Sequence, residues 1–321
     1  MRPIGDTLRS MRADTFEFTA DDGKQLFVYR FLPDPGVQAK AVVHVAHGMA
    51  EHGARYARAA EALTRHGYIV YANDHRGHGK TARCAEDLGF IAEHGGFYRV
   101  VQDLSQLVAH EKQEHPGLPV VLFGHSMGSF YAQQFLIEHG KEIAGAVLCG
   151  TSGKPPPIAS AGRIVARIER LRLGARGKSA LINKLSFDTY NKFFKPNRTA
   201  FDWLSRDPAE VDKYIADPLC GFVCSISLWV DLLDSLAQIA APKRQRQIPK
   251  NTPIYVIAGA EDPVSDRTRG IAQLLRAYRA AGLQHVQHRY YPGTRHELFN
   301  ETNRDEVVQD LVAWLDAHIK A

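Results

Sequence analysis

Cysteine is scarce in this sequence, with four residues among 321. Cys149 lies in an apolar run that is typical of a buried strand, and so few thiols do not make the disulfide framework of a small secreted domain. The sequence therefore indicates a reducing compartment. Cys220 and Cys224 lack a second pair of Cys or His at the spacing of zinc ligands, so we predict no metal site.

Long apolar runs are also missing. The segment Met1–Thr15 contains three arginines but no apolar stretch that would form the core of a secretory leader. No uninterrupted apolar stretch elsewhere reaches the roughly 20 residues that a membrane-spanning helix needs. We therefore expect a cytoplasmic protein.

The sequence has no Lys- and Arg-rich run interleaved with the aromatic residues that a nucleic-acid groove uses for stacking. The net charge is only +5, so nucleic acid is not an expected partner. Residues 152–250 nevertheless contain 17 Lys and Arg against 9 Asp and Glu, a net charge of +8 that leaves −3 for the rest of the chain. This middle segment is chemically distinct. No feature of the sequence indicates an oligomeric state.

Hydrophobic residues make up 45% of the chain, which is sufficient for a large core. Short apolar runs that end near glycine or a polar turn predict buried parallel strands at Ala41–Ala46, Tyr68–Ala72, Pro119–Phe123 and Ala144–Cys149. Two further strands are predicted at Pro253–Ala258 and His285–Tyr291. Helical patterns separate most of these runs. The alternation predicts an α/β fold with a mostly parallel, doubly wound sheet.

A hairpin is predicted before the first parallel strand, around Asp21-Asp-Gly23. Between about Ser152 and Ala240 the alternation of strands and helices stops. We interpret residues 152–240 as a mainly helical cap inserted above the strand ends. Residues 1–151 and 241–321 would form the α/β core that carries this cap.

The sharpest local signal is Gly124-His-Ser-Met-Gly128, which follows a predicted buried strand and precedes a helical pattern. A serine on so tight a turn must adopt strained backbone angles, and the flanking glycines relieve the crowding around it. Ser126 would then be presented as a nucleophile at the edge of the sheet. The helix that begins there directs free N–H groups at the site, so we expect the Met127 N–H to stabilise an oxyanion.

Three further features follow other predicted strands. A glycine turn at His47-Gly-Met49 can place the Met49 N–H opposite that of Met127 and complete an oxyanion hole. Asp262 lies in the loop after a later strand, and His296 lies in the loop after the last one. The chain order Ser, Asp, His is the one by which α/β enzymes of this topology assemble a triad at one sheet edge.

These residues predict nucleophilic catalysis by a serine. Ser126 alone is a poor nucleophile at neutral pH, so a neutral His296 would accept its proton during attack and return it to the leaving group. Asp262 would fix the tautomer of His296 and stabilise the imidazolium. Water would then hydrolyse the acyl-enzyme, and no cofactor is required.

Two nearby features have structural interpretations. Asp266 is the alternative acid, but its position is typical of a helix N-cap. The segment His75-Arg-Gly-His-Gly79 resembles an active-site cluster, and we interpret it as a glycine-rich loop packed beside the nucleophile turn.

Together the motifs resemble the monoacylglycerol lipase and lysophospholipase branch of the α/β-hydrolases, also described as serine aminopeptidase-like. The resemblance spans most of the chain and rests on the segments His47–Tyr56, Asp74–Gly79, Gly124–Gly128, Gly259–Asp262 and His296–Glu301. It implies the α/β-hydrolase fold, with Ser126, Asp262 and His296 as the triad. It also assigns the oxyanion positions to the amides of Met49 and Met127. The segment Asp217–Phe222 is similar to bacterial relatives, without a known role.

The resemblance implies hydrolysis of monoacylglycerols, lysophospholipids or other medium- to long-chain acyl esters beneath a mobile cap. Within residues 158–173, one helical face carries the apolar side chains of Ala161, Ile164, Val165, Ile168 and Leu171. Because Arg163, Arg167 and Arg170 lie elsewhere, such a helix can dock transiently on an anionic membrane surface and make the protein peripheral to membranes. We favour the alternative, in which the apolar face packs on the core.

Two other functions are open. An aminopeptidase or amidase would use the same triad and need an acidic anchor for the substrate's amino group, for which Glu210, Asp231 and Asp234 are candidates. The basic excess of the predicted cap argues against such an anchor. A noncatalytic receptor on this fold is expected to have a damaged triad, whereas all three members are present here.

Overall fold

The computed structural model describes residues 11–156 and 158–320, so most of the N-terminal segment in which no leader was predicted lies outside the described residues. An eight-stranded sheet forms the centre, in the order β1-β2-β4-β3-β5-β6-β7-β8. The strands are β1 Arg12–Thr19, β2 Gln25–Leu32, β3 Ala41–Ala46, β4 Tyr68–Asn73, β5 Val120–His125, β6 Gly145–Cys149, β7 Ile254–Gly259 and β8 Val286–Tyr291.

The six predicted strands are confirmed to within two residues at each end, and they pair in parallel from β4 to β8. Strands β3 to β7 are buried along their whole length, because helices cover both faces of the sheet. The predicted hairpin is also confirmed, since β1 pairs antiparallel with β2, and β2 with β4.

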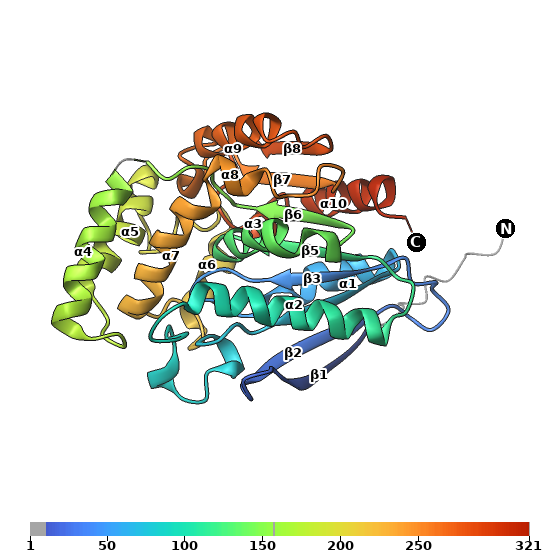
Figure 1. Ribbon diagram of the computed structural model, residues 1–321, viewed down its shortest axis with the longest axis horizontal. Helices are drawn as coiled ribbons and strands as arrows, with labels where there is room; N and C mark the ends of the chain where they lie inside the picture. The colour runs from blue at the N-terminus through green and yellow to red at the C-terminus, as the bar shows by residue number, and fades with distance from the viewer. Residues whose placement is uncertain (1–10, 157, 321) are drawn as a thin grey trace.

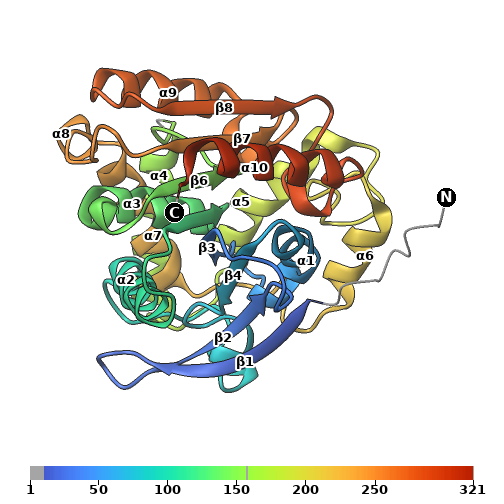
Figure 2. The ribbon, with the colours of Figure 1, turned by 90° about the vertical axis from the view of Figure 1, so that its right-hand side faces the viewer.

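Helices cover both faces of the sheet (Figures 1 and 2). On one face, apolar residues of α1 (Ala57–Arg65) and α10 (Arg304–His318) pack against the sheet. On the other face lie α2 (Gly96–Glu114), α3 (Met127–His139) and α9 (Arg269–Ala280). The predicted α/β architecture, a mostly parallel, doubly wound sheet, is therefore confirmed.

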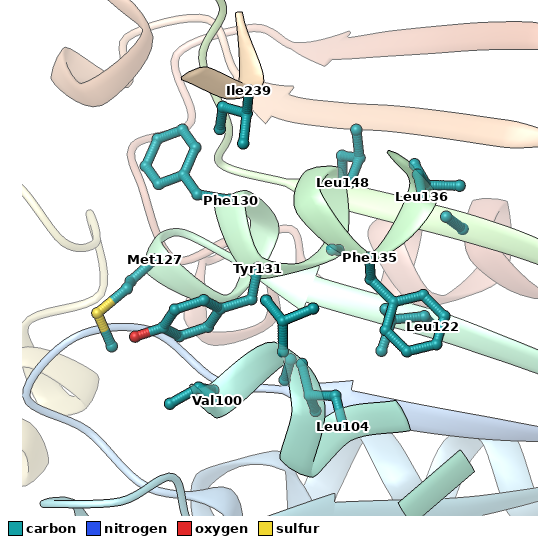
Figure 3. Close-up of a cluster of buried hydrophobic side chains, with 14 of the residues drawn as sticks. Val100, Leu104, Leu122, Met127, Phe130, Tyr131, Phe135, Leu136, Leu148 and Ile239 are labelled. Atoms are coloured by element: carbon teal, nitrogen blue, oxygen red, sulfur yellow. The ribbon is translucent and has the colours of Figure 1, made fainter. Parts of the chain in front are cut away.

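Helix α3 is the most deeply buried of these helices, with every residue from Met127 to Ile137 buried. Figure 3 shows its apolar side chains between Val100 and Leu104 of α2 and residues of β5, β6 and α7. This packing fixes the N-terminus of α3 relative to the end of β5. It therefore also fixes the turn between them, on which Ser126 lies.

Between β6 and β7 the chain forms α4 (Ile158–Leu173), α5 (Ala180–Asn191), α6 (Pro208–Ala216) and α7 (Ile226–Ile239), and the short α8 (Pro242–Gln245) follows. Helices α4, α5 and α7 lie together at one end of the sheet (Figure 1), with α7 packed against α2, α3 and α4. The division into a separate cap unit over residues 152–240 stays a prediction. Among the described residues, no helix combines the length and the apolar character needed to cross a membrane.

The preferred prediction for α4 is wrong. Ile164, Ile168 and Leu171, which were expected to pack on the core, are 61%, 57% and 91% exposed. The helix instead approaches α7 through the buried Ala166, and Arg163 and Arg167 reach Asp234 of α7 at 2.7 and 2.9 Å. Because its polar side is held in this way, α4 presents apolar side chains outward.

Candidate active site

Ser126 occupies a strained turn between β5 and α3. Its φ and ψ are 51° and −118°, and such a positive φ costs a non-glycine residue about 1–3 kcal/mol. A Cβ on Gly124 would collide with the carbonyl of Gly128, and one on Gly128 with the carbonyl of Ala46, so both flanking glycines are required. The Ser126 N–H donates to the Cys149 carbonyl at 2.9 Å, which ties the turn to β6.

His296 and Asp262 form a buried pair in the loops after β8 and β7. The His296 Nδ1 atom lies 3.0 Å from both carboxylate oxygens of Asp262, and the two residues are 2% and 0% exposed. The Val264 N–H donates to Asp262 Oδ1 at 2.9 Å and orients the carboxylate. Since a Cβ on Gly259 would collide with the Thr294 and Arg295 carbonyls, that glycine allows the two loops to approach.

The charge environment distinguishes His296 from its neighbour His125. Burial disfavours the imidazolium of His296, but the Asp262 carboxylate outweighs burial and raises the pKa above its ordinary value. Burial, together with the nearby His296, lowers the pKa of His125 to about 4. The centroids of the His125 and His296 rings are 4.7 Å apart. The ring of Trp203, a residue of the predicted cap, lies 5.0 Å from the His296 ring. His296 is thus the better proton acceptor of the two.

Ser126 and His296 line one cavity of about 90 Å³. Its other walls include Gly48, Met49, Ala50, Glu51, Phe201, Trp203, Leu204, Phe222 and Glu297. The hydrogen bonds of the described residues do not include one between Ser126 and His296, and such contacts often tighten only when substrate binds. The predicted nucleophile and base therefore face a common space, with Asp262 behind the histidine.

The two predicted oxyanion donors differ in their surroundings. Met127 is the first residue of α3, where a backbone N–H has no acceptor within its own helix. Met49 belongs to the turn after β3 and lines the cavity. In that turn the Gly48 N–H is already bound to Glu51 Oε1 at 2.6 Å, which leaves the Met49 N–H as the next donor along the chain. Their role in binding an oxyanion stays a prediction.

An ionic network beside the cavity was not predicted from the sequence. The Arg55 guanidinium donates to Glu297 at 2.6 and 2.7 Å and to Glu51 at 2.7 Å. All three side chains are nearly buried, and the network connects the turn after β3 to the residue that follows His296. Both segments were recognised as motifs, but only the tertiary structure shows that a single arginine joins them.

Several other candidate residues lie away from the cavity. Asp266 is largely exposed, and Thr268 rather than Asp266 occupies the N-cap of α9, so the predicted capping role is wrong. His75 packs edge to face on Tyr131 of α3, with ring centroids 5.3 Å apart. His78 is also buried, in agreement with a structural loop beside the nucleophile turn.

The acidic anchors considered for an amino group are engaged elsewhere. Glu210 pairs with Arg58, Asp234 pairs with two arginines of α4, and Asp231 accepts the Gly96 N–H at 2.6 Å. None of the three lines the cavity.

One group among the described residues has the composition of a metal site. Ligand atoms of His52, Asp217 and Cys220 lie within 4.8 Å of one another. His52 Nε2 donates to the Asp217 carboxylate at 2.8 Å, which accounts for their proximity. The absence of a metal stays a prediction.

We expect the free energy of unfolding to fall as the pH is lowered from about 6.5 to about 4. Burial lowers the pKa of His78 and His125 to about 4, whereas imidazoles in the unfolded chain titrate near about 6.5. Between these values the unfolded state binds more protons, so acid favours unfolding. The pKa values of His47 and His75 are also well below normal, again mainly because of burial.

His44 and His296, which lie beside carboxylates, have raised pKa values and therefore stabilise the fold at low pH. The four buried histidines with lowered pKa values outnumber them, so the net effect of acid is destabilising. Urea unfolding at pH 7, 6, 5 and 4.5 measures the slope of the free energy of unfolding against pH. His78→Gln should reduce this slope, and the exposed His288→Gln should leave it unchanged. Stability that is constant or rises as the pH falls through this range would contradict the assignment of neutral buried imidazoles.

Comparison with known proteins identifies the family. Residues 37–303 match the family described as serine aminopeptidase, S33. The chain belongs to this family of α/β-hydrolases. It is 28% identical over 290 residues to the monoacylglycerol lipase of Mycolicibacterium smegmatis, covering 89% of this chain and 91% of that protein. It is 29% identical over 292 residues to the monoglyceride lipase of Homo sapiens, covering 88% and 86%.

A solved structure is similar in both fold and sequence. The thermostable carboxyl esterase of Bacillus coagulans, determined in complex with glycerol, has a TM-score of 0.87 and 28% identity, covering 96% of this chain and 99% of that one. This member of the S33 family is therefore a hydrolase of the serine esterase type. The family and enzyme class predicted from the motifs are confirmed.

Proposed function

We propose that this S33-family protein hydrolyses acyl esters such as monoacylglycerols or lysophospholipids with Ser126 as nucleophile, His296 as base and Asp262 as the residue that orients the base. The observation that carries the proposal is the shared cavity of Ser126 and His296, with the Asp262 carboxylate 3.0 Å behind the imidazole. The strained φ of Ser126 supports it, because such strain persists where the surrounding structure holds it for a function.

The reaction follows from these positions. His296 Nε2 accepts the Ser126 proton as Oγ attacks the ester carbonyl, and Asp262 stabilises the imidazolium that forms. The Met49 and Met127 amides donate to the oxyanion of the tetrahedral intermediate. The imidazolium then protonates the leaving alcohol, and water attacks the acyl-enzyme with His296 again as base. The chain supplies every catalytic group in these reaction steps and the solvent supplies the water, so no cofactor is proposed.

A lipid ester fits the character of the cavity walls. Phe201, Leu204 and Phe222 supply apolar surface, and all three come from the predicted cap. The cavity of about 90 Å³ has room for only a few water-sized groups. We therefore propose that residues 152–240 act as a cap that shifts to admit an acyl chain.

The direct test compares initial rates on a monoacylglycerol and on aminoacyl nitroanilides, with the chelated and untreated protein. Faster turnover of the ester that survives chelation supports the lipase assignment. Turnover confined to aminoacyl amides would move the assignment to a peptidase with the same triad. The carboxylates of Glu51 and Glu297 line the cavity and favour that alternative, but Arg55 pairs with both of them.

We further propose that α4 makes a transient contact with anionic lipid surfaces. Its exposed Ile168 and Leu171 supply apolar area, and the basic side chains of the same helix supply attraction to anionic headgroups. The predicted result is sedimentation of the protein with anionic vesicles at low salt, reduced at least about threefold in the Ile168→Ser/Leu171→Ser variant. Ile215→Ser, at an exposed isoleucine of α6, is the matched control. Absence of sedimentation at low salt would contradict the docking role.

A further inference from the structure

The segment from Tyr214 to Phe222 contains the motif Asp217-Pro-Leu-Cys-Gly-Phe222, to which the proposed reaction assigns no role. It lies at the end of α6, a helix that runs beside α1 in Figure 2 and is joined to it by the Arg58–Glu210 ion pair at 2.9 Å. We call residues 214–221 the clasp segment, because they contact the turn that contains Met49. The contacts are polar, directional and largely buried.

Two of these contacts converge on a single atom. The Tyr214 hydroxyl donates to the Ala50 carbonyl oxygen at 3.0 Å, and the Gly221 N–H donates to the same oxygen at 2.9 Å. Ala50 is 2% exposed and Tyr214 is 6% exposed, so water does not readily replace either donor. Gly221 has a φ of 68°, and a Cβ there would press on the rings of Phe201 and Tyr214.

A third contact ties the clasp segment to the same turn from the other side. Asp217 Oδ2 lies 2.8 Å from His52 Nε2, and its Oδ1 accepts the Leu219 N–H at 2.8 Å. The Asp217 carboxylate therefore holds its own loop and the residue two positions beyond Ala50 at the same time. His52 is 6% exposed, which shields this pair from solvent on one side.

The turn itself needs to be held. Ala50 has a φ of 54°, in the left-handed region that a non-glycine residue adopts only when its surroundings impose it. On the inner side, Glu51 accepts the Gly48 N–H at 2.6 Å. On the outer side, the clasp segment binds the Ala50 carbonyl. Met49 lies in the chain between Gly48 and Ala50, which these contacts hold, so the direction of its N–H depends on both contacts.

We propose that Tyr214 and Asp217 are positioning residues that hold the left-handed Ala50 turn and thereby aim the Met49 N–H at the oxyanion. This inference rests on the proposed function, because it presumes that Met49 is an oxyanion donor. It assigns a role to the Asp217–Phe222 motif and makes the oxyanion hole dependent on the predicted cap.

The effect belongs to the transition state rather than to substrate binding. A misdirected N–H weakens contact with the charged tetrahedral oxygen more than contact with the neutral carbonyl of the bound ester. Loss of a whole oxyanion donor costs roughly 10²–10³-fold in kcat, so a donor that is only misaimed should cost less, about 10-fold.

The test uses the full-length Tyr214→Phe variant, which removes the hydroxyl but keeps the ring that lies 4.9 Å from the Arg55 guanidinium. Tyr278→Phe is the matched control, since its buried hydroxyl has no hydrogen-bond partner among the described residues. Asp217→Asn is a second variant that weakens the clasp independently, in case the first does not fold. Each is assayed for kcat, KM and thermal stability.

Two inhibitors separate positioning from a merely structural role. In an alkyl trifluoromethyl ketone, the Ser126 Oγ–carbon bond forms, the serine proton passes to His296, and the carbonyl oxygen becomes an oxyanion. An ether of the same shape binds without reacting. We expect Tyr214→Phe to lower kcat and the affinity for the ketone by a similar factor of about 10. KM and the affinity for the ether should change less than about twofold. Asp217→Asn should show the same pattern.

Unchanged kcat and ketone affinity in both variants would overturn the proposal. An equal loss of affinity for the ketone and the ether would also overturn it, because that pattern indicates a role in binding alone. The Ser126→Ala variant separates failure of this proposal from failure of the proposed function. If Ser126 is not the nucleophile, Ser126→Ala retains ester turnover, whatever kcat the Tyr214 and Asp217 variants have.

Discussion

The Ser126→Ala variant is expected to lose ester hydrolysis by at least about 10⁴-fold in kcat, because removal of the nucleophile leaves only the oxyanion donors and substrate binding. The variant should fold normally, since the backbone contacts that hold the turn come from the Ser126 N–H and carbonyl rather than from Oγ. Initial rates on a monoacylglycerol, with thermal unfolding as a check on folding, measure the effect.

A serine outside the cavity provides the control for this substitution. Ser105 of α2 contacts Glu142 and does not line the cavity, so Ser105→Ala should keep ester turnover within about twofold of wild type. Persistence of turnover in Ser126→Ala, at a rate above that of a protein-free blank, would show that another group is the nucleophile.

Asp262→Asn is expected to lower kcat by about 10⁴-fold, because an amide at this position favours the wrong tautomer of His296 and no longer stabilises the imidazolium. The Asp262 carboxylate raises the pKa of His296 against the effect of burial. Its removal should therefore move the acidic limb of the kcat/KM profile to lower pH. Rates across pH 4.5–8 measure both effects.

Asp266→Asn is the matched control for this experiment. Asp266 follows the same strand but is largely exposed, and its carboxylate makes a long contact of 3.6 Å with Arg269. We expect little change in kcat and none in the pH profile. A large loss of kcat in Asp266→Asn, together with near-normal kcat in Asp262→Asn, would show that Asp266 rather than Asp262 orients His296.

The sequence predicted most of the sheet because short apolar runs such as Ala41–Ala46 match the full burial of central parallel strands. It also indicated where Ser126, Asp262 and His296 lie relative to the strand ends. In a parallel sheet those ends meet at one edge, so their proximity follows from topology alone.

The prediction failed where long-range contacts decide the outcome. The periodicity of α4 indicated an apolar face correctly but could not say which neighbour the helix meets, and the pairing of its arginines with Asp234 turned that face outward. The bridge from Arg55 to Glu297 joins residues 242 positions apart, for which a single sequence has no local signal. The clasp on Ala50 likewise depends on a contact across 164 residues.

The most direct test of Ser126 as the nucleophile is covalent labelling with an alkyl fluorophosphonate, followed by peptide mapping of the intact, folded protein. We expect one phosphonyl adduct per chain, on the peptide that contains Ser126, with loss of ester turnover in proportion to labelling. Labelling of another residue, or full turnover in the completely labelled protein, would contradict it.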